Sequence, residues 1–222
     1  MDGFLLVDKE KGLSSFDEIR RARNLSGQRK IGHGGTLDPL ATGLLVLGFN
    51  KATKQLEKML GVDKEYETVA FFGAVSDSYD ADGKIEKVDG AVVAKKDEIL
   101  RVIKENFLGE ISQCPPKYSA LKIKGKRACD IMRAGGTVDI KPRQITVFDF
   151  ELLSLAWPRA HFLIKCSSGT YVRSLIHDLG QKLGCGAYVE ELRRTKVGDF
   201  DVKNAVRLGE KKQIEESDLI NI

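Results

Sequence analysis

The order of strand-like and helix-like segments is the feature of this sequence that most constrains its fold. Short apolar, β-branched and aromatic runs predict strands over residues 4–7, 44–49, 65–75, 145–155 and 161–166. Apolar residues at helical spacing predict helices over about 15–23, 51–60, 97–107 and 172–183. Because the two kinds of segment are mixed rather than strictly alternating, we expect an α+β fold with a mostly antiparallel mixed sheet flanked by helices.

Local signals fix two of the helix ends. Ser15 and Glu18 have the S-x-x-E spacing of a capping box, which predicts that the first helix begins there. Gly184 follows the last residue of an apolar helical face that includes Leu175 and Leu179, and a glycine at this point is typical of a helix end.

The composition is that of an ordinary globular protein. Of the 222 residues, 42% are hydrophobic and 31% are charged, which argues against a disordered or fibrous chain. From this length we expect one main folded body. The longest apolar runs are far shorter than the roughly 20 residues of a membrane helix, and the first residues lack the pattern of a secretion signal. We therefore expect a cytoplasmic protein that does not contact the membrane.

Positive charge is concentrated in one segment. Residues 114–143 hold eight basic and two acidic side chains, a local net charge of +6, whereas the whole chain carries only +4. Everything outside this segment therefore sums to −2. A basic segment of this kind is often a solvated surface, but it also fits an RNA-binding insertion.

A glycine-rich loop over residues 32–43 contains His33 and Asp38. Its glycines allow close approach of another backbone, so the loop suits the presentation of Asp38 to a bulky ligand. The spacing of Gly27 and Gly32 resembles a P-loop, but His33 stands where the phosphate-binding lysine is needed, which excludes ATP or GTP binding there. The four cysteines are scattered without a C-x-x-C pair, so we expect no metal site.

Four segments in this order resemble the TruB family of tRNA pseudouridine synthases. They are GHGGTLDPLATGLLVLG at 32–48, DKEYET at 63–68, PPKYSALKIKGKRACDIMRAG at 115–135 and CSSGTYVRSLIHDLGQKLGCGAYVEELRRTKVGDF at 166–200. Together they span nearly the whole chain. The resemblance implies the pseudouridine synthase fold with a basic thumb loop inserted over residues 114–143. It also implies an isomerase that converts uridine 55 in the T loop of tRNA to pseudouridine without a cofactor or a metal.

The resemblance also implies roles for individual residues. Asp38 matches the catalytic aspartate, Tyr66 the tyrosine that stacks on the target uracil, and Arg173 the arginine that pairs with the aspartate. Further matches to substrate-binding positions are His33, Tyr171, Leu192 and Lys54, and the RNA-binding residues of the thumb are Lys122, Lys124, Lys126 and Arg127. Taken singly, Asp38-Pro39 is a common turn dipeptide and Lys54 is more typical of a structural helix position.

The sequence departs from the family pattern in two places. Gly34 and Thr36 replace a threonine and an alanine of the commonest bacterial loop, a change that we expect to be tolerated. The chain ends at Ile222, so we expect no C-terminal PUA domain and a different extent of RNA contact.

Two alternative functions remain open at this point. One is the catalytic subunit of a guide-RNA-directed pseudouridylation complex, and the other is a non-catalytic RNA-binding or tRNA-folding protein. We expect the T stem-loop of tRNA to be the partner, with no guide RNA, and we expect a monomer. The presence of Asp38, Tyr66 and Arg173 together favours catalysis.

Overall fold

The computed structural model describes residues 1–123 and 125–221, and it divides into two compact units. Unit 1 comprises Met1–Glu67 and the C-terminal residues from Leu192 onward, and unit 2 comprises Thr68–Glu191. Two strands, β4 (Lys64–Phe72) and β12 (Ala187–Val197), contribute residues to both units.

Unit 1 is built around strand β3. Antiparallel pairing joins β3 to β1 and to β2, and the part of β12 that belongs to unit 1 pairs with β3 in parallel at Arg193 and Thr42. The remaining elements of unit 1 are short helical segments and one short strand. The bounds are β1 Gly3–Lys9, α1 Ser15–Ser26, β2 Ile31–His33, β3 Thr42–Phe49, η1 Asn50–Gln55, α2 Leu56–Gly61, β13 Phe200–Asp201, η2 Val202–Asn204, η3 Leu208–Glu210 and η4 Glu216–Asp218.

The core of unit 1 explains why β1 and β3 are apolar along almost their whole length. Phe4 and Leu6 of β1 pack with Leu44 and Val46 of β3, and Leu56 of α2 closes the same cluster. Burial of such side chains contributes about 1.5–3 kcal/mol each. The Asp38 loop, which connects β2 to β3, is therefore attached to the most buried part of the unit.

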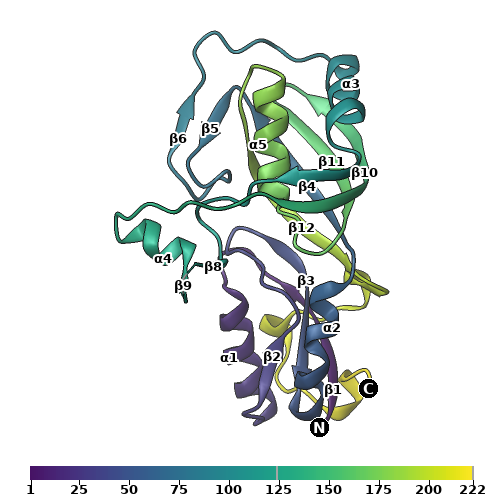
Figure 1. Cartoon of the computed structure of the whole chain (residues 1–222). Coiled ribbons are helices and arrows are strands. Elements are labelled where there is room, and N and C mark those ends of the chain that lie inside the picture. The colour runs from purple at the N-terminus through teal and green to yellow at the C-terminus, as the bar shows by residue number, and fades with distance from the viewer. Residues whose placement is uncertain (124, 222) are drawn as a thin grey trace. The chain divides into compact units, whose positions relative to one another are not determined.

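Unit 2 is built around the long strand β10, which pairs antiparallel with β11 on one side and β7 on the other. Helix α3 contacts both α5 and β10, and Figure 1 shows α3 and α5 alongside this part of the sheet. Phe107, Phe150 and Phe162 form an edge-to-face cluster in its core. The bounds are β5 Ala74–Ser76, β6 Ile85–Lys87, α3 Lys96–Asn106, β7 Gly109–Gln113, β8 Lys122–Ile123, β9 Lys126–Arg127, α4 Ala128–Arg133, β10 Arg143–Ala156, β11 Arg159–Cys166 and α5 Val172–Lys182.

The basic segment 114–143 forms a distinct part of unit 2. It contains the short hairpin β8–β9 followed directly by α4, and Figure 1 shows these elements standing away from the sheet of that unit. Lys124 lies outside the described residues. We refer to residues 114–143 as the thumb segment below.

The structure confirms the predicted fold class and several of the predicted elements. The sheet is mixed and mostly antiparallel with flanking helices, as predicted from the sequence. The helices predicted over 97–107 and 172–183 are α3 and α5, and the paired strands predicted over 145–155 and 161–166 are β10 and β11.

Three local predictions were wrong. The capping box is formed by Ser14 and Asp17, one residue earlier than predicted, because the hydroxyl of Ser15 is engaged elsewhere. The predicted helix over 51–60 begins as the 3-10 helix η1 and becomes α-helical only at Leu56. The predicted strand over 65–75 is interrupted at Gly73, which adopts a left-handed conformation with φ of 85°.

Within residues 1–123 and 125–221, the structure has no helix that is both long and apolar enough to cross a membrane.

Candidate active site

The Asp38 loop of unit 1 holds its carboxylate in a fixed stretch of backbone. Asp38 is half-buried and is flanked by the buried side chains of Leu37 and Leu40. The Ser15 hydroxyl of α1 accepts a hydrogen bond from the Leu37 N–H at 2.9 Å and lies 3.2 Å from the Leu37 carbonyl oxygen, to which it donates. The Asp38 carbonyl accepts a hydrogen bond from Ala41 at 3.0 Å. The backbone is therefore held on both sides of Asp38.

Two glycines of this loop are required by close packing. A Cβ atom on Gly34 would lie 2.8 Å from the Cβ of Met59, and one on Gly43 would collide with the backbone of Arg194. Gly43 also has a φ of 95°, a backbone conformation that residues other than glycine rarely adopt. The glycine at position 34 thus fits the neighbouring Met59 in this chain.

Arg194 of β12 connects the two ends of the Asp38 loop. Its side chain is only 2% exposed, and its guanidinium donates hydrogen bonds to the carbonyls of Leu44 at 2.8 Å and Gly35 at 3.1 Å. A buried guanidinium that satisfies backbone carbonyls is costly to replace, because those carbonyls would lose their partners. The sequence analysis did not identify Arg194, which lies in a run of charged residues without a clear strand pattern.

A buried lysine, Lys9, lies beneath the same loop. Its ammonium donates to the carbonyls of Leu13 at 2.8 Å, Glu10 at 3.0 Å and Pro39 at 3.4 Å. Burial lowers the pKa of Lys9 to about 8, and the nearby carboxylates of Glu18 and Asp38 oppose that shift. A positive charge that can be lost in mild alkali is therefore close to Asp38.

The other predicted residues of unit 1 differ in their environments. His33 ends β2, and burial, followed by the charge of Arg194, lowers its pKa, which favours the neutral imidazole. Tyr66 is half-buried on β4, whereas Leu192 on β12 is buried. Lys54 is exposed on η1, an environment typical of a solvated side chain.

Arg173 is the best-connected residue of the predicted set in unit 2. It lies in the first turn of α5, is 4% exposed and forms an ion pair with Asp80 at 3.1 Å. Its guanidinium also donates to the carbonyls of Ser78 at 2.8 Å and Tyr118 at 2.9 Å. Arg173 therefore ties the turn between β5 and β6 to the beginning of the thumb segment.

Asp80 was not among the residues identified from the sequence. Asp80 is 3% exposed, and its Oδ1 accepts hydrogen bonds from the Ser78 hydroxyl at 2.6 Å and the Asp82 N–H at 3.1 Å. A buried carboxylate needs partners of this kind. The signal in the sequence was the presence of three aspartates between residues 77 and 82.

Tyr171 is held immediately before α5. Its backbone N–H donates to the Gln113 side chain at 2.8 Å, and the amide of Gln113 donates to the Tyr171 carbonyl at 3.0 Å. The guanidinium of Arg143 lies 4.8 Å from the centre of the Tyr171 ring, within the range of a cation–π contact. The ring is therefore placed by the last residue of the thumb segment.

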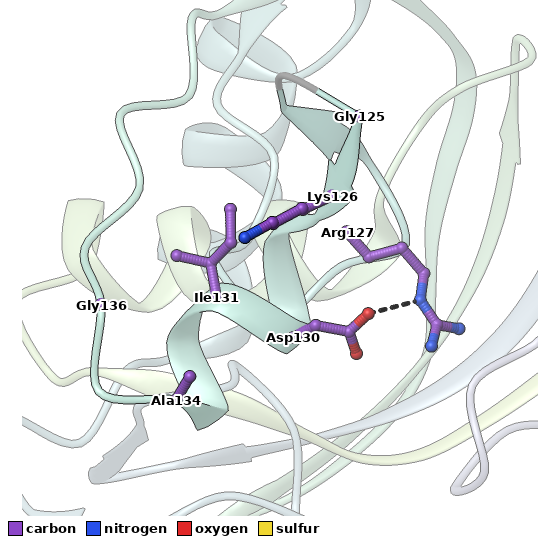
Figure 2. Close-up of a pocket in the computed structure, with 7 residues that line it drawn as sticks. All are labelled: Gly125, Lys126, Arg127, Asp130, Ile131, Ala134 and Gly136. Atoms are coloured by element: carbon purple, nitrogen blue, oxygen red, sulfur yellow. Dashed lines mark hydrogen bonds and ion pairs between the residues drawn. The ribbon is translucent and has the colours of Figure 1, made fainter.

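Residues of the thumb segment line an open hollow of about 630 Å³. Figure 2 shows Lys126 extending toward Ile131, and Arg127 paired with Asp130. The guanidinium Nε of Arg127 lies 2.8 Å from a carboxylate oxygen of Asp130. Lys126 and Arg127 are both exposed. Of the other thumb residues predicted to bind RNA, Lys124 is outside the described residues, and Lys122 is placed on β8 by its backbone.

The predicted residues divide between the two units. His33, Asp38, Lys54, Tyr66 and Leu192 belong to unit 1, whereas Tyr171, Arg173 and the thumb residues belong to unit 2. Within residues 1–123 and 125–221, no group of three or more His, Cys, Asp or Glu side chains is arranged to hold a metal ion.

Comparison with known families gives two matches that follow one another along the chain. Residues 23–172 match the N-terminal domain of the TruB family pseudouridylate synthases, and residues 173–218 match the C-terminal domain of tRNA pseudouridylate synthase B. The chain is 48% identical to tRNA pseudouridine synthase B of Aquifex aeolicus over 95% of its length and 73% of that relative. It is 44% identical to the enzyme of the same name from Endomicrobium trichonymphae, over 93% of the chain and 90% of that relative.

Solved structures give a consistent result. The structure is similar to a chain of a Cbf5–Nop10–Gar1 complex, with a TM-score of 0.73 and 31% identity over 93% of this chain and 52% of that one. A chain of an H/ACA ribonucleoprotein bound to a substrate RNA containing 2′-deoxyuridine gives a TM-score of 0.69 with 29% identity, over 93% of this chain and 51% of that one. The chain thus spans about half the length of these two structural relatives.

Proposed function

Because the chain belongs to the TruB family of tRNA pseudouridine synthases, we propose that it isomerises uridine 55 in the T loop of tRNA to pseudouridine. The observation that carries this proposal is the 48% identity with a tRNA pseudouridine synthase B over 95% of the chain. The backbone around Asp38, held by Ser15 on one side and by its own turn on the other, supports a fixed catalytic carboxylate.

The reaction needs no redox change. The bond between C1′ and N1 of the uridine breaks, the uracil rotates, and a bond forms between C1′ and C5. The proton on C5 is lost and N1 gains one, so substrate and product are isomers. We propose that the Asp38 carboxylate acts as the nucleophile or assists the proton transfer, both of which require its ionised form.

The target base must leave its stack before it can react. Flipping costs a few kcal/mol, and stacking on an aromatic side chain returns about 1–3 kcal/mol per base. We propose Tyr66 as that aromatic side chain, with His33, Leu192 and Tyr171 as further substrate-binding residues. Lys54, exposed on η1, is the least supported member of the set.

We propose that Arg173 supplies the positive charge that keeps the catalytic carboxylate ionised. A neighbouring guanidinium typically lowers the pKa of an aspartate by about 1–3 units. The three partners of Arg173 in unit 2, which are Asp80 and the carbonyls of Ser78 and Tyr118, hold its guanidinium in one orientation. A fixed charge of this kind requires no reorganisation during the reaction.

The remaining parts of the proposal concern organisation and partners. We propose that residues 1–222 act as one catalytic domain, with the thumb segment 114–143 inserted in it. The enzyme acts as a monomer in the cytoplasm on the T stem-loop, without a guide RNA, a cofactor or a metal. The alternative of a guided complex is supported by the 31% identity with the chain of the Cbf5–Nop10–Gar1 complex. The higher identity to tRNA pseudouridine synthase B favours an enzyme that acts on tRNA without a guide RNA.

The decisive experiment uses the purified chain, EDTA and a synthetic T stem-loop with uridine at the target position. Mass spectrometry after cyanoethylation detects pseudouridine. A hairpin with cytidine at that position is the control. We expect complete conversion of the uridine hairpin at a rate comparable to that with whole tRNA. A requirement for an added guide RNA or protein would support the guided complex instead, and RNA binding without product would support the non-catalytic alternative.

A further inference from the structure

Helix α1 presents a second basic surface that the charge analysis of the sequence overlooked. The stretch from Arg20 to Lys30 contains no acidic residue, and its basic residues are Arg20, Arg21, Arg23, Arg29 and Lys30. Arg21 forms an ion pair with Glu10, at 2.8 Å between the guanidinium and the carboxylate, and Arg20 forms one with Asp17 on the same helix. Arg20, Arg29 and Lys30 are exposed, and because an exposed ion pair contributes little, Arg20 can exchange Asp17 for a phosphate. The positive charge of this chain is therefore not confined to the thumb segment.

An exposed aromatic ring lies on the same side of α1. Phe16 is 55% exposed, and the guanidinium carbons of Arg20 and Arg23 each lie 5.8 Å from the centre of its ring. Residues 16, 20 and 23 are spaced by four and three positions, which places their side chains on one face of the helix. We call Phe16, Arg20 and Arg23 on the helix, together with Arg29 and Lys30 in the segment that follows its end at Ser26, the α1 face.

The α1 face begins beside the Asp38 loop within unit 1. Ser15, the neighbour of Phe16 in the chain, forms both hydrogen bonds to the backbone of Leu37, and Leu37 immediately precedes Asp38. Helix α1 also contacts β2, the strand that leads into the loop, as Figure 1 shows. A ligand that reaches Asp38 with one nucleotide therefore has the α1 face next to it.

The length and chemistry of the α1 face fit a polynucleotide. Its helix has 12 residues and so extends about 18 Å, which corresponds to roughly five nucleotide steps of one strand at about 3.4 Å each. Guanidinium groups bind phosphates in a bidentate manner, and an exposed ring beside them is the combination found where bases stack on protein. A membrane partner does not fit, because the apolar side of α1, with Ile19 and Ala22, is already buried.

We infer that the α1 face binds the substrate RNA strand next to the reacting nucleotide, with Arg20, Arg23, Arg29 and Lys30 on phosphates and Phe16 against an unpaired base. This inference rests on the proposed function, because it takes RNA as the substrate. It adds a binding surface in unit 1 to the thumb segment of unit 2.

The test compares two variants with the same loss of charge. The first changes Arg20, Arg29 and Lys30 to Gln, and the control changes Lys96, Arg101 and Lys104, which are exposed on α3 of unit 2, to Gln. The affinity of each for a tRNA transcript is measured from 50 to 300 mM salt, roughly the range in which phosphate contacts dominate. Thermal unfolding of each variant checks that it is folded.

We expect the first variant to bind at least about tenfold more weakly at low salt and to lose about 2–2.7 from the magnitude of its log K against log salt slope, at 0.7–0.9 for each phosphate contact. The control should keep the slope of the unmodified protein. The control should also keep the single-turnover rate of the unmodified protein. An unchanged slope in the first variant, or an equal loss in the control, would overturn the inference.

Phe16 is tested separately by changing it to Leu and to Tyr. Loss of one stacked base should weaken binding by about 5- to 150-fold in the Leu variant. The Tyr variant should keep the affinity of the unmodified protein. Equal affinity of the Leu and Tyr variants would remove Phe16 from the inferred surface. If the unmodified protein makes no pseudouridine while the charge variant still loses slope, the proposed chemistry fails and the binding surface stands.

Discussion

At the scale of single residues, buried ions impose the strongest constraints on the candidate site. Arg173, Asp80 and Arg194 are each less than 5% exposed, and all have specific partners in their own unit. A buried charge that loses its partner is destabilising by about 3–5 kcal/mol. Each of these residues therefore has a structural role beside any part in the reaction.

The ion pair between Arg173 and Asp80 gives the first prediction. Changing Asp80 to Ala should lower the free energy of unfolding by about 3 kcal/mol, the lower end of the range for a broken buried pair, because Arg173 keeps two backbone carbonyls. Urea denaturation measures the effect. Asp82 is exposed two positions away, and its change to Ala is the control that should cost little. Equal losses for the two variants would contradict the importance of the pair.

Asp178 of α5 gives a prediction about pH. Burial raises its pKa to about 6, although Lys182 acts in the opposite direction. Between the ordinary value of 3.8 and about 6, the folded protein binds this proton more tightly than the unfolded chain does. The contribution of Asp178 to stability therefore falls as the pH rises through that window.

Changing Asp178 to Asn should remove this penalty. At pH 7 the variant should be more stable than the unmodified protein by about 1 kcal/mol, since partial exposure reduces the effect of the shift. At about pH 3.5 the difference should vanish. Denaturation at the two pH values measures it, and the exposed Asp89 changed to Asn is the control. A stabilisation that is the same at both pH values would contradict the assignment to this carboxyl group.

Tyr66 gives a prediction about the reaction. The Phe variant keeps the ring that stacks on the base, whereas the Leu variant loses the ring as well as the hydroxyl. If the hydroxyl helps to remove the C5 proton, the Phe variant should bind RNA normally and react about 10²–10⁴ times more slowly in a single turnover. An undiminished rate would leave Tyr66 with a stacking role alone. The Leu variant should in addition bind more weakly.

At the scale of secondary structure, regular apolar patterns were predictable and mixed ones were not. Helices α3 and α5 have apolar residues on one face and polar residues elsewhere, so their positions followed from periodicity. Strand β12 was missed because four charged residues that are not buried interrupt its buried ones. These are Glu190, Glu191, Arg193 and Lys196, and Arg194 is buried in spite of its charge. Helix caps depend on one hydroxyl, and Ser14 was the correct one because Ser15 is bound to Leu37.

The candidate site shows the same division. Asp38 could be proposed from the sequence because a glycine-rich loop and the family resemblance point to the same residue, and its role stays a prediction. Asp80 and Lys9 could not, since their roles depend on burial and on partners that are distant in the sequence, such as Arg173 and the carbonyl of Pro39.

The thumb segment gives a prediction at this scale. Changing Lys122, Lys124 and Lys126 together to Gln should weaken RNA binding and lower the magnitude of the salt slope by about 2–2.7, at 0.7–0.9 for each phosphate contact. Titrations of the RNA at several salt concentrations measure the slope. The variant with Lys96, Arg101 and Lys104 of α3 changed to Gln is again the charge-matched control. A slope that stays at its original value would remove these lysines from the RNA surface.

At the scale of the whole molecule, different parts of the chain have different proposed tasks. Unit 1 carries the Asp38 loop and the α1 face, and unit 2 carries Arg173 with its partners and the thumb segment. Phosphate contacts and stacking should supply the affinity for RNA, whereas the single carboxylate should supply the chemistry. Binding and turnover should therefore be separable by mutation.

The most direct test of this account changes Asp38 to Asn. The variant keeps the shape of the side chain but cannot act as a carboxylate, so single-turnover formation of pseudouridine in the T stem-loop should fall below detection while the RNA affinity stays within a few fold. The exposed Asp63 of the same unit, changed to Asn, is the control and should keep full activity. An Asp38 to Asn variant that still forms pseudouridine at a tenth of the normal rate or more would contradict the assignment of Asp38 as the catalytic residue.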